Sequence, residues 1–182
     1  MFARLKQRLT ICPLVRYWLE AALWLALIGA CAFGVQAIGE PETLRSETQF
    51  SIPLPVFLTV TFVLPSCLEE IVFRGLLQPQ NLSSIRDYVL SALSLALFVV
   101  WHPVQVWLHL PMGQPLFLKP EFLLMSFILG LACTALTRRS TSLWPAILLH
   151  WLSVIGWKLF FSEVFTRTLS HNFTCDRPLD YT

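Results

Sequence analysis

Five long runs of apolar residues dominate the pattern of the chain and predict its secondary structure. They lie near residues 17–38, 52–77, 88–109, 117–137 and 143–161. A helix rises 1.5 Å per residue, so each run is long enough to cross a hydrocarbon core of about 30 Å. The segments between the runs are short. The pattern therefore predicts an all-α fold, a polytopic membrane helix bundle of about five transmembrane helices.

The composition supports a membrane protein and excludes several other classes. Of 182 residues, 55% are hydrophobic and 13% are charged, and mean hydropathy is +0.64. Soluble domains carry about 25% charged residues. A net charge of +2 is too small to indicate a nucleic-acid partner. The cysteines form no C-x-x-C pair, which excludes a disulfide framework and a structural zinc site; they are Cys12, Cys31, Cys67, Cys133 and Cys175.

The distribution of charge predicts the domain organisation and the orientation. No internal repeat is present, and residues 1–165 are expected to form one membrane-embedded domain, followed by a loose tail at 166–182. Basic residues precede the first run and lie between the second and third and between the fourth and fifth, whereas residues 40–51 are acidic on balance. By the positive-inside rule the N-terminus of this multi-pass protein is expected in the cytoplasm. The basic residues concerned are Arg4, Lys6, Arg8, Arg16, Arg86, Arg138 and Arg139.

Ionisable residues interrupt three of the apolar runs. Glu69, Glu70 and Arg74 lie in the second, His102 in the third and His150 in the fifth. A carboxylate at the bilayer centre costs about 2.5–3.5 kcal/mol even on the mildest insertion scale, and such groups usually face a wet, protein-lined cavity. These side chains are therefore the candidate functional residues.

Helix geometry predicts different roles for the two glutamates. Neighbouring helical residues point about 100° apart, so the two carboxylates cannot share one direction. Glu70 and Arg74 are at i, i+4 and can form an ion pair. Glu69 then faces another sector and can accept a proton. Pro65 removes a backbone donor just before the pair, so a kink is expected that opens space beside Glu69.

Several interpretations of these residues remain open at this point. The glutamates and arginine could merely lock two helices, and a lone buried histidine more often hydrogen-bonds a neighbouring helix than does chemistry. In a metal mechanism Glu69, His102 and His150 would bind zinc and leave a position for water. In a metal-free mechanism Glu69 and His102 would polarise water, and His150 would stabilise an oxyanion. His109 and His171 are interpreted as interface or surface groups.

Three sequence motifs resemble those of a known family. Residues 68–77 (LEEIVFRGLL) resemble the E-E-x-x-x-R signature of the CPBP family, which comprises CAAX proteases and bacteriocin-processing enzymes and is also called the Abi family. Residues 98–102 (FVVWH) match its F-x-x-x-H motif. Residues 142–150 (SLWPAILLH) resemble the approach to its third motif, H-x-x-x-N/D. The motifs occur in order, each on an apolar run, and the resemblance covers about residues 52–160.

The resemblance implies an intramembrane endopeptidase that cuts a membrane-associated peptide or protein, either CAAX-type or bacteriocin-like. It implies that Glu69 activates water together with His102, that Glu70 pairs with Arg74, and that His150 stabilises the oxyanion. The metal-free mechanism is favoured, so no cofactor is expected, with zinc as the alternative. The partners are then the lipid bilayer and the substrate, and the active-site cavity is expected to face the cytoplasm.

One position departs from the family pattern. The family's Asn or Asp should follow His150 by four residues, but position 154 is valine. Ser153 lies about 100° round the helix and could replace the lost donor only if the helix were locally rotated. Loss of one oxyanion donor costs about 10²–10³ in rate. The alternative function is therefore a non-catalytic membrane immunity or assembly protein on the same scaffold. A third possible function is a proton pathway through Glu69, His102 and His150.

Overall fold

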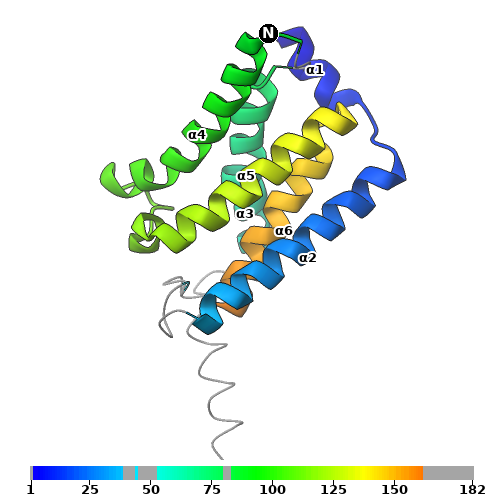
Figure 1. Ribbon diagram of the computed structural model, residues 1–182. Helices are drawn as coiled ribbons and strands as arrows, with labels where there is room; N and C mark the ends of the chain where they lie inside the picture. Colours follow the sequence, from blue (N-terminus) through cyan, green and yellow to red (C-terminus); the bar gives the residue numbers. More distant parts are fainter. Residues whose placement is uncertain (1, 39–43, 45–52, 80–82, 162–182) are drawn as a thin grey trace, which may run out of the picture.

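The computed structural model describes residues 2–38, 44, 53–79 and 83–161, and their regular secondary structure is entirely helical (Figure 1). The predicted all-α fold class is confirmed. The predicted tail at 166–182, His171, and most of the acidic loop at 40–51 lie outside the described residues. The helices are α1 (Phe2–Thr10), α2 (Val15–Ile38), α3 (Leu54–Thr61), η1 (Phe62–Leu68), η2 (Ile71–Leu77), α4 (Ile85–Trp107), η3 (Pro115–Leu118), α5 (Pro120–Ser140) and α6 (Trp144–Phe160).

All five predicted apolar runs form helices, and the chain is an integral, multi-pass membrane protein. Within the part of the chain that the structure describes, four segments are long and apolar enough to cross a bilayer, namely α2, the composite helix Leu54–Leu77, α4 and α5. At 17 residues, α6 extends about 26 Å, slightly less than the hydrocarbon core. The fourth run begins later than predicted, because the short 3₁₀-helix η3 occupies its expected first residues and buries Leu116 and Phe117.

Helix α5 lies at the centre of the bundle and contacts α2, α4 and α6 (Figure 1). At one end of the bundle lie α1, the start of α4, the end of α5 and the start of α6. At the other end lie the end of α2, the connection between α4 and α5, and the end of α6. The first of these is called the basic end below, because it carries the basic residues that predict the orientation of the chain.

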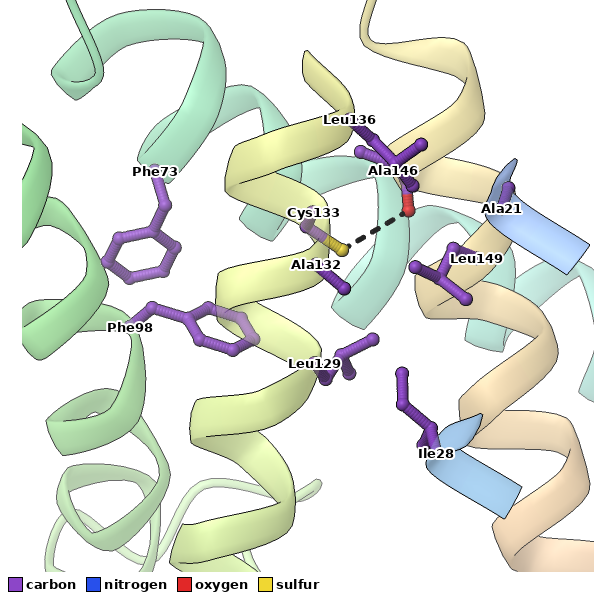
Figure 2. Close-up of a cluster of buried hydrophobic side chains, with 10 residues drawn as sticks. All are labelled: Ala21, Ile28, Phe73, Phe98, Leu129, Ala132, Cys133, Leu136, Ala146 and Leu149. Atoms are coloured by element: carbon purple, nitrogen blue, oxygen red, sulfur yellow. Dashed lines mark hydrogen bonds between the residues drawn. The ribbon is translucent and has the colours of Figure 1, made fainter. Parts of the chain in front are cut away.

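Small residues on α5 allow the central helices to approach closely. Ala132 and Cys133 are fully buried, and the Cys133 thiol donates a hydrogen bond to the Ala146 carbonyl of α6 at 3.6 Å (Figure 2). A Cβ on Gly130 would come within 2.9 Å of the Phe98 ring on α4. Helices in membranes associate largely through van der Waals packing across such small residues. This packing fixes α4 and α6, which carry the two histidines, on opposite sides of α5.

The composite helix Leu54–Leu77 departs from α-helical geometry where the sequence predicts a distortion. Residues Phe62–Leu68, which include Pro65, and residues Ile71–Leu77 are π-helical. Proline has no N–H to donate, and the Ser66 hydroxyl donates instead to the Thr61 carbonyl at 2.9 Å. π-Helical turns often occur at functional sites. The acidic pair, Glu69 and Glu70, lies between the two π-helical segments.

The N-terminal helix α1 was not predicted, yet it docks against the end of η2. The Arg8 side chain is buried, with 2% exposed, and its guanidinium donates hydrogen bonds to the carbonyls of Arg74, Gln78 and Pro79. Carbonyls at a helix C-terminus have no partner within the helix. Burial, and to a smaller extent the positive charge of Arg4, lowers the pKa of Arg8 to about 10. The Arg8 side chain is therefore still charged at neutral pH.

Replacing Arg8 by alanine is expected to lower the thermal unfolding temperature. The substitution leaves buried carbonyls without donors, and each unsatisfied buried group costs about 1–3 kcal/mol. Thermal unfolding of the purified protein in lipid–detergent mixtures measures the effect. Lys6→Ala is the matched control, because Lys6 lies on the exposed face of the same helix. Equal unfolding temperatures for the two variants would show that the Arg8 contacts do not stabilise the fold.

Candidate active site

The structure brings the predicted ionisable residues into the interior of the bundle from three helical segments. Glu69 and Glu70 lie between η1 and η2, and Arg74 lies one turn further along η2. His102 is on α4 and His150 on α6. All five side chains are buried. Residues more than 80 positions apart in the sequence are thus gathered around the acidic pair.

Glu70 is held by two donors on one carboxylate oxygen. Arg74 Nη1 donates to Glu70 Oε1 at 3.0 Å, which is the ion pair expected from the i, i+4 spacing. His150 Nδ1 lies 3.0 Å from the same oxygen, a contact that the sequence did not predict. The Arg74 guanidinium also donates to the Gly130 carbonyl at 3.0 Å and lies over the Phe98 ring. Glu70 is therefore tied to α5 and α6.

The contact with Glu70 fixes the orientation of the His150 ring. An ionised carboxylate only accepts hydrogen bonds, so Nδ1 of His150 carries the hydrogen of this contact. The other ring nitrogen, Nε2, points towards Glu69 and lies 4.0 Å from its Oε2. His150 thus connects the two glutamates, binding one directly and facing the other across a short gap.

Glu69 has one anchored and one free carboxylate oxygen. The Trp101 indole donates to Glu69 Oε1 at 3.1 Å. Oε2 is buried and accepts no hydrogen bond from any residue in the described part of the chain. Sequence reasoning missed Trp101, although an indole next to His102 in an apolar helix was a usable signal, because a buried indole N–H usually finds an acceptor. Glu69 is positioned by Trp101 with its second oxygen available.

His102 reaches the same region from α4. Its Nδ1 lies 3.0 Å from the Phe98 carbonyl, which can only accept, so Nδ1 is the donor and Nε2 remains an acceptor. The Phe98 ring packs edge-on between the two imidazoles, with ring centroids 5.2 Å from His102 and 5.7 Å from His150. The two histidines therefore share a rigid aromatic wall.

Glu69, His102 and His150 line one cavity of about 500 Å³. This volume falls within the range of about 300–1,000 Å³ that is usual for small-ligand sites. Glu70 does not line the cavity. Most of the remaining wall is apolar and comes from α2, α5 and α6; its further polar members are Gln105, Gln114, Ser126, Ser153 and Lys158. The arrangement places a free carboxylate oxygen and two imidazoles at the surface of an otherwise apolar cavity.

Val154 and Ser153 both line this cavity, one turn beyond His150. Helix α6 is a regular α-helix throughout Trp144–Phe160, and the Ser153 hydroxyl donates to the Leu149 carbonyl at 2.8 Å. Helix α6 therefore has no irregularity at Ser153, and Ser153 as a substitute for the family's Asn or Asp stays a prediction. Its hydroxyl hydrogen is bound to the helix backbone and is not directed at the cavity.

A catalytic zinc ion would need three protein side chains that converge on one point. Within residues 2–38, 44, 53–79 and 83–161, no group of three His, Cys, Asp or Glu side chains is arranged to hold an ion. Glu69, His102 and His150 share the cavity without forming such a group. The geometry of these three side chains in this structure therefore does not fit a zinc site.

One comparison with known proteins gave a match. A family model described as "Type II CAAX prenyl endopeptidase Rce1-like" matches residues 51–156, more than half of the chain. The matched segment contains Glu69, Glu70, Arg74, His102 and His150, and it agrees with the resemblance at residues 52–160. No curated protein and no solved structure matches the chain. Helix α1 lies outside the matched segment.

Proposed function

This chain belongs to the Rce1-like family of type II CAAX prenyl endopeptidases, and from that premise we propose that it hydrolyses a peptide bond of a membrane-tethered substrate with water activated by Glu69. The observation that carries the proposal is the free Oε2 of Glu69, buried at the surface of the cavity and 4.0 Å from His150 Nε2. A water molecule beside this oxygen would lie next to both the carboxylate and the imidazole.

In the proposed reaction Glu69 acts as general base and then as general acid. Its Oε2 takes a proton from water, and the resulting hydroxide attacks the carbonyl carbon of the scissile peptide bond. The tetrahedral intermediate then collapses, the C–N bond breaks, and the leaving nitrogen takes the proton back from Glu69. Trp101 holds Oε1 throughout, so that Oε2 keeps its direction. His102 Nε2 helps to orient the water.

His150 is assigned the oxyanion. With Nδ1 donating to Glu70, its Nε2 faces Glu69 and the cavity and would donate to the oxyanion in the doubly protonated form of the ring. A donor aimed at the developing negative charge stabilises the transition state electrostatically. The ion pair of Glu70 with Arg74 holds the acceptor that fixes this ring. Glu70 and Arg74 therefore position His150 without meeting the substrate.

The substrate is proposed to be a CAAX-type or bacteriocin-like peptide carrying an apolar group. The apolar wall of the cavity suits a lipid chain or large hydrophobic side chains, and Glu69, His102 and His150 offer polar groups to a peptide bond. A buried apolar surface stabilises a bound apolar group by roughly 25 cal/mol per Å² removed from water. The apolar walls would thus supply the binding free energy of the substrate, and Glu69, His102 and His150 would carry out the hydrolysis.

Cleavage is expected to survive metal chelation, because the proposed steps use only glutamate and histidine side chains. The purified protein in lipid vesicles would be incubated with a membrane-tethered reporter peptide, with and without EDTA or 1,10-phenanthroline, and products identified by mass spectrometry. Unchanged product formation is the expected result. Loss of cleavage that added Zn²⁺ restores would instead support the zinc alternative at Glu69, His102 and His150.

A second candidate function is favoured by one residue. Val154 occupies the position where the family pattern places a polar donor, and the neighbouring Ser153 hydroxyl donates to the Leu149 carbonyl. On that observation the chain is proposed, as the alternative, to be a non-catalytic immunity or assembly protein built on the protease scaffold.

A further inference from the structure

The cavity beside Glu69 is closed at the basic end of the bundle and extends towards the other end. From this asymmetry and the distribution of charge, we propose that water and substrate reach Glu69 from the non-cytoplasmic side of the membrane. The substrate part of this inference rests on the proposed function, whereas the access route does not. It also reverses the expectation that the cavity faces the cytoplasm.

A layer of fully buried side chains closes the basic end. It lies in the last turns of η2 and α5 and at the start of α6, between the acidic pair and the basic residues. Each member is at most 1% exposed; they are Arg74, Gln78, Leu136, Thr137, Leu143, Ala146 and Ile147. None of them lines the cavity. Water entering from this end would have to displace packed side chains.

Helix α1 and the turn after it cover this layer from outside. The Leu5 side chain packs so closely that a Cβ on Gly75 would lie 2.7 Å from it. The Leu143 N–H donates to the Arg8 carbonyl at 3.1 Å, and the Trp144 indole donates to the Leu9 carbonyl at 2.9 Å. Together with the Arg8 guanidinium, these contacts join η2 and α6 across the basic end.

The walls of the cavity come from the opposite half of the bundle. Residues 25–33 lie in the second half of α2, residues 122–129 in the first half of α5, and residues 150–160 in the later part of α6. Residues 111–117 of the α4–α5 connection complete the wall. Exposed members of the wall lie at this far end of the bundle; they are Phe33, Pro111, Leu159 and Phe160. Among the described residues, the cavity wall therefore reaches the surface of the bundle at the end away from the basic end.

The charge distribution assigns the two ends to the two sides of the membrane. The closed end carries the basic residues of α1, of the start of α2, of the start of α4 and of the end of α5. At the cavity end the described basic residues are Lys119 and Lys158. Cytoplasmic ends of membrane proteins carry the excess of Lys and Arg. The closed end is thus cytoplasmic, and the peptide segment that is cut must lie on the non-cytoplasmic side.

Side-specific thiol labelling tests the access route without relying on proteolysis. Gly156→Cys places a thiol in the cavity wall, where an added Cβ meets no atom within 4 Å, and Gly29→Cys is a second such site. Lys6→Cys marks the basic end and Lys119→Cys marks the other end, since both residues are exposed. The background chain carries serine at Cys12, Cys31, Cys67 and Cys175 and keeps the fully buried Cys133.

A charged, membrane-impermeant methanethiosulfonate reagent is applied to right-side-out and inside-out vesicles. In one vesicle orientation the reagent reaches Lys119→Cys, and in the other it reaches Lys6→Cys. We expect the reagent to label Gly156→Cys and Gly29→Cys only in the orientation in which it reaches Lys119→Cys. Labelling from the Lys6 side, or from neither side in chains that unfold like the parent, overturns the proposal.

In oriented proteoliposomes a reporter peptide should be cut only when supplied on the Lys119 side. Correct labelling without any cleavage would refute the proposed function and leave the access route standing.

Discussion

Glu69→Gln is expected to reduce the rate of peptide-bond cleavage by about 10²–10⁴-fold, the usual contribution of a positioned general base. Glutamine has the shape of glutamate, and its carbonyl oxygen can still accept the Trp101 hydrogen bond, so the local structure is retained. What is lost is the ability of the second oxygen to take a proton from water. Turnover of the reporter peptide measures the effect, and thermal unfolding shows that the fold is intact.

Glu121→Gln is the matched control for this substitution. Glu121 is a carboxylate in the first turn of α5 and does not line the cavity. We expect that variant to cleave at the parental rate. Parental turnover in a correctly folded Glu69→Gln protein would remove the enzymatic interpretation altogether, because no other carboxylate among the described residues lines the cavity.

The bundle itself was predictable because membranes impose strong rules on sequence. Backbone groups in hydrocarbon must be satisfied within the segment, so a long apolar run has few solutions other than a helix. The same rule made the acidic pair conspicuous, since charges in such runs are costly. The Glu70–Arg74 ion pair followed from helical spacing alone, and the structure contains it at 3.0 Å.

The contacts that organise the site are tertiary and left no local trace in the sequence. His150 and Glu70 are 80 residues apart, and Trp101 and Glu69 are 32 residues apart. Arg8 also illustrates the limit, because its charge was counted as a cytoplasmic signal while its side chain is buried against η2. A basic residue contributes to the topology of a chain wherever it points, so the positive-inside rule cannot distinguish these two roles.

The direction of the cavity could not be obtained from residue depth. The sequence led us to expect an active-site cavity that faces the cytoplasm. Depth along one helix does not say which neighbouring helices leave space beside it. In the structure, packed side chains and α1 fill the nearer end, and the space lies towards the further one. In the proposed access route, this packing determines the side from which water and substrate reach Glu69.

Val154→Asn is expected to raise the cleavage rate by up to about 10²-fold, because restoring an oxyanion donor recovers part of the roughly 10²–10³ that its absence costs. Position 154 lies one helical turn beyond His150 and lines the same cavity, so an amide N–H₂ there can point towards the scissile carbonyl. Asparagine and valine differ little in volume. The increase should appear in kcat with the reporter peptide, while the unfolding temperature stays close to that of the parent.

Val154→Leu separates this donor effect from a mere change of wall shape, because leucine alters the wall without offering an N–H, and no gain is expected from it. A gain with both substitutions would mean that the cavity volume, not an oxyanion donor, limits the parent. If Val154→Asn gives no cleavage, and Glu69→Gln supports growth of a deletion strain as well as the parent does, the free carboxylate has no catalytic task. The buried Glu70–Arg74–His150 network would then be the structural centre of a membrane protein that acts by binding.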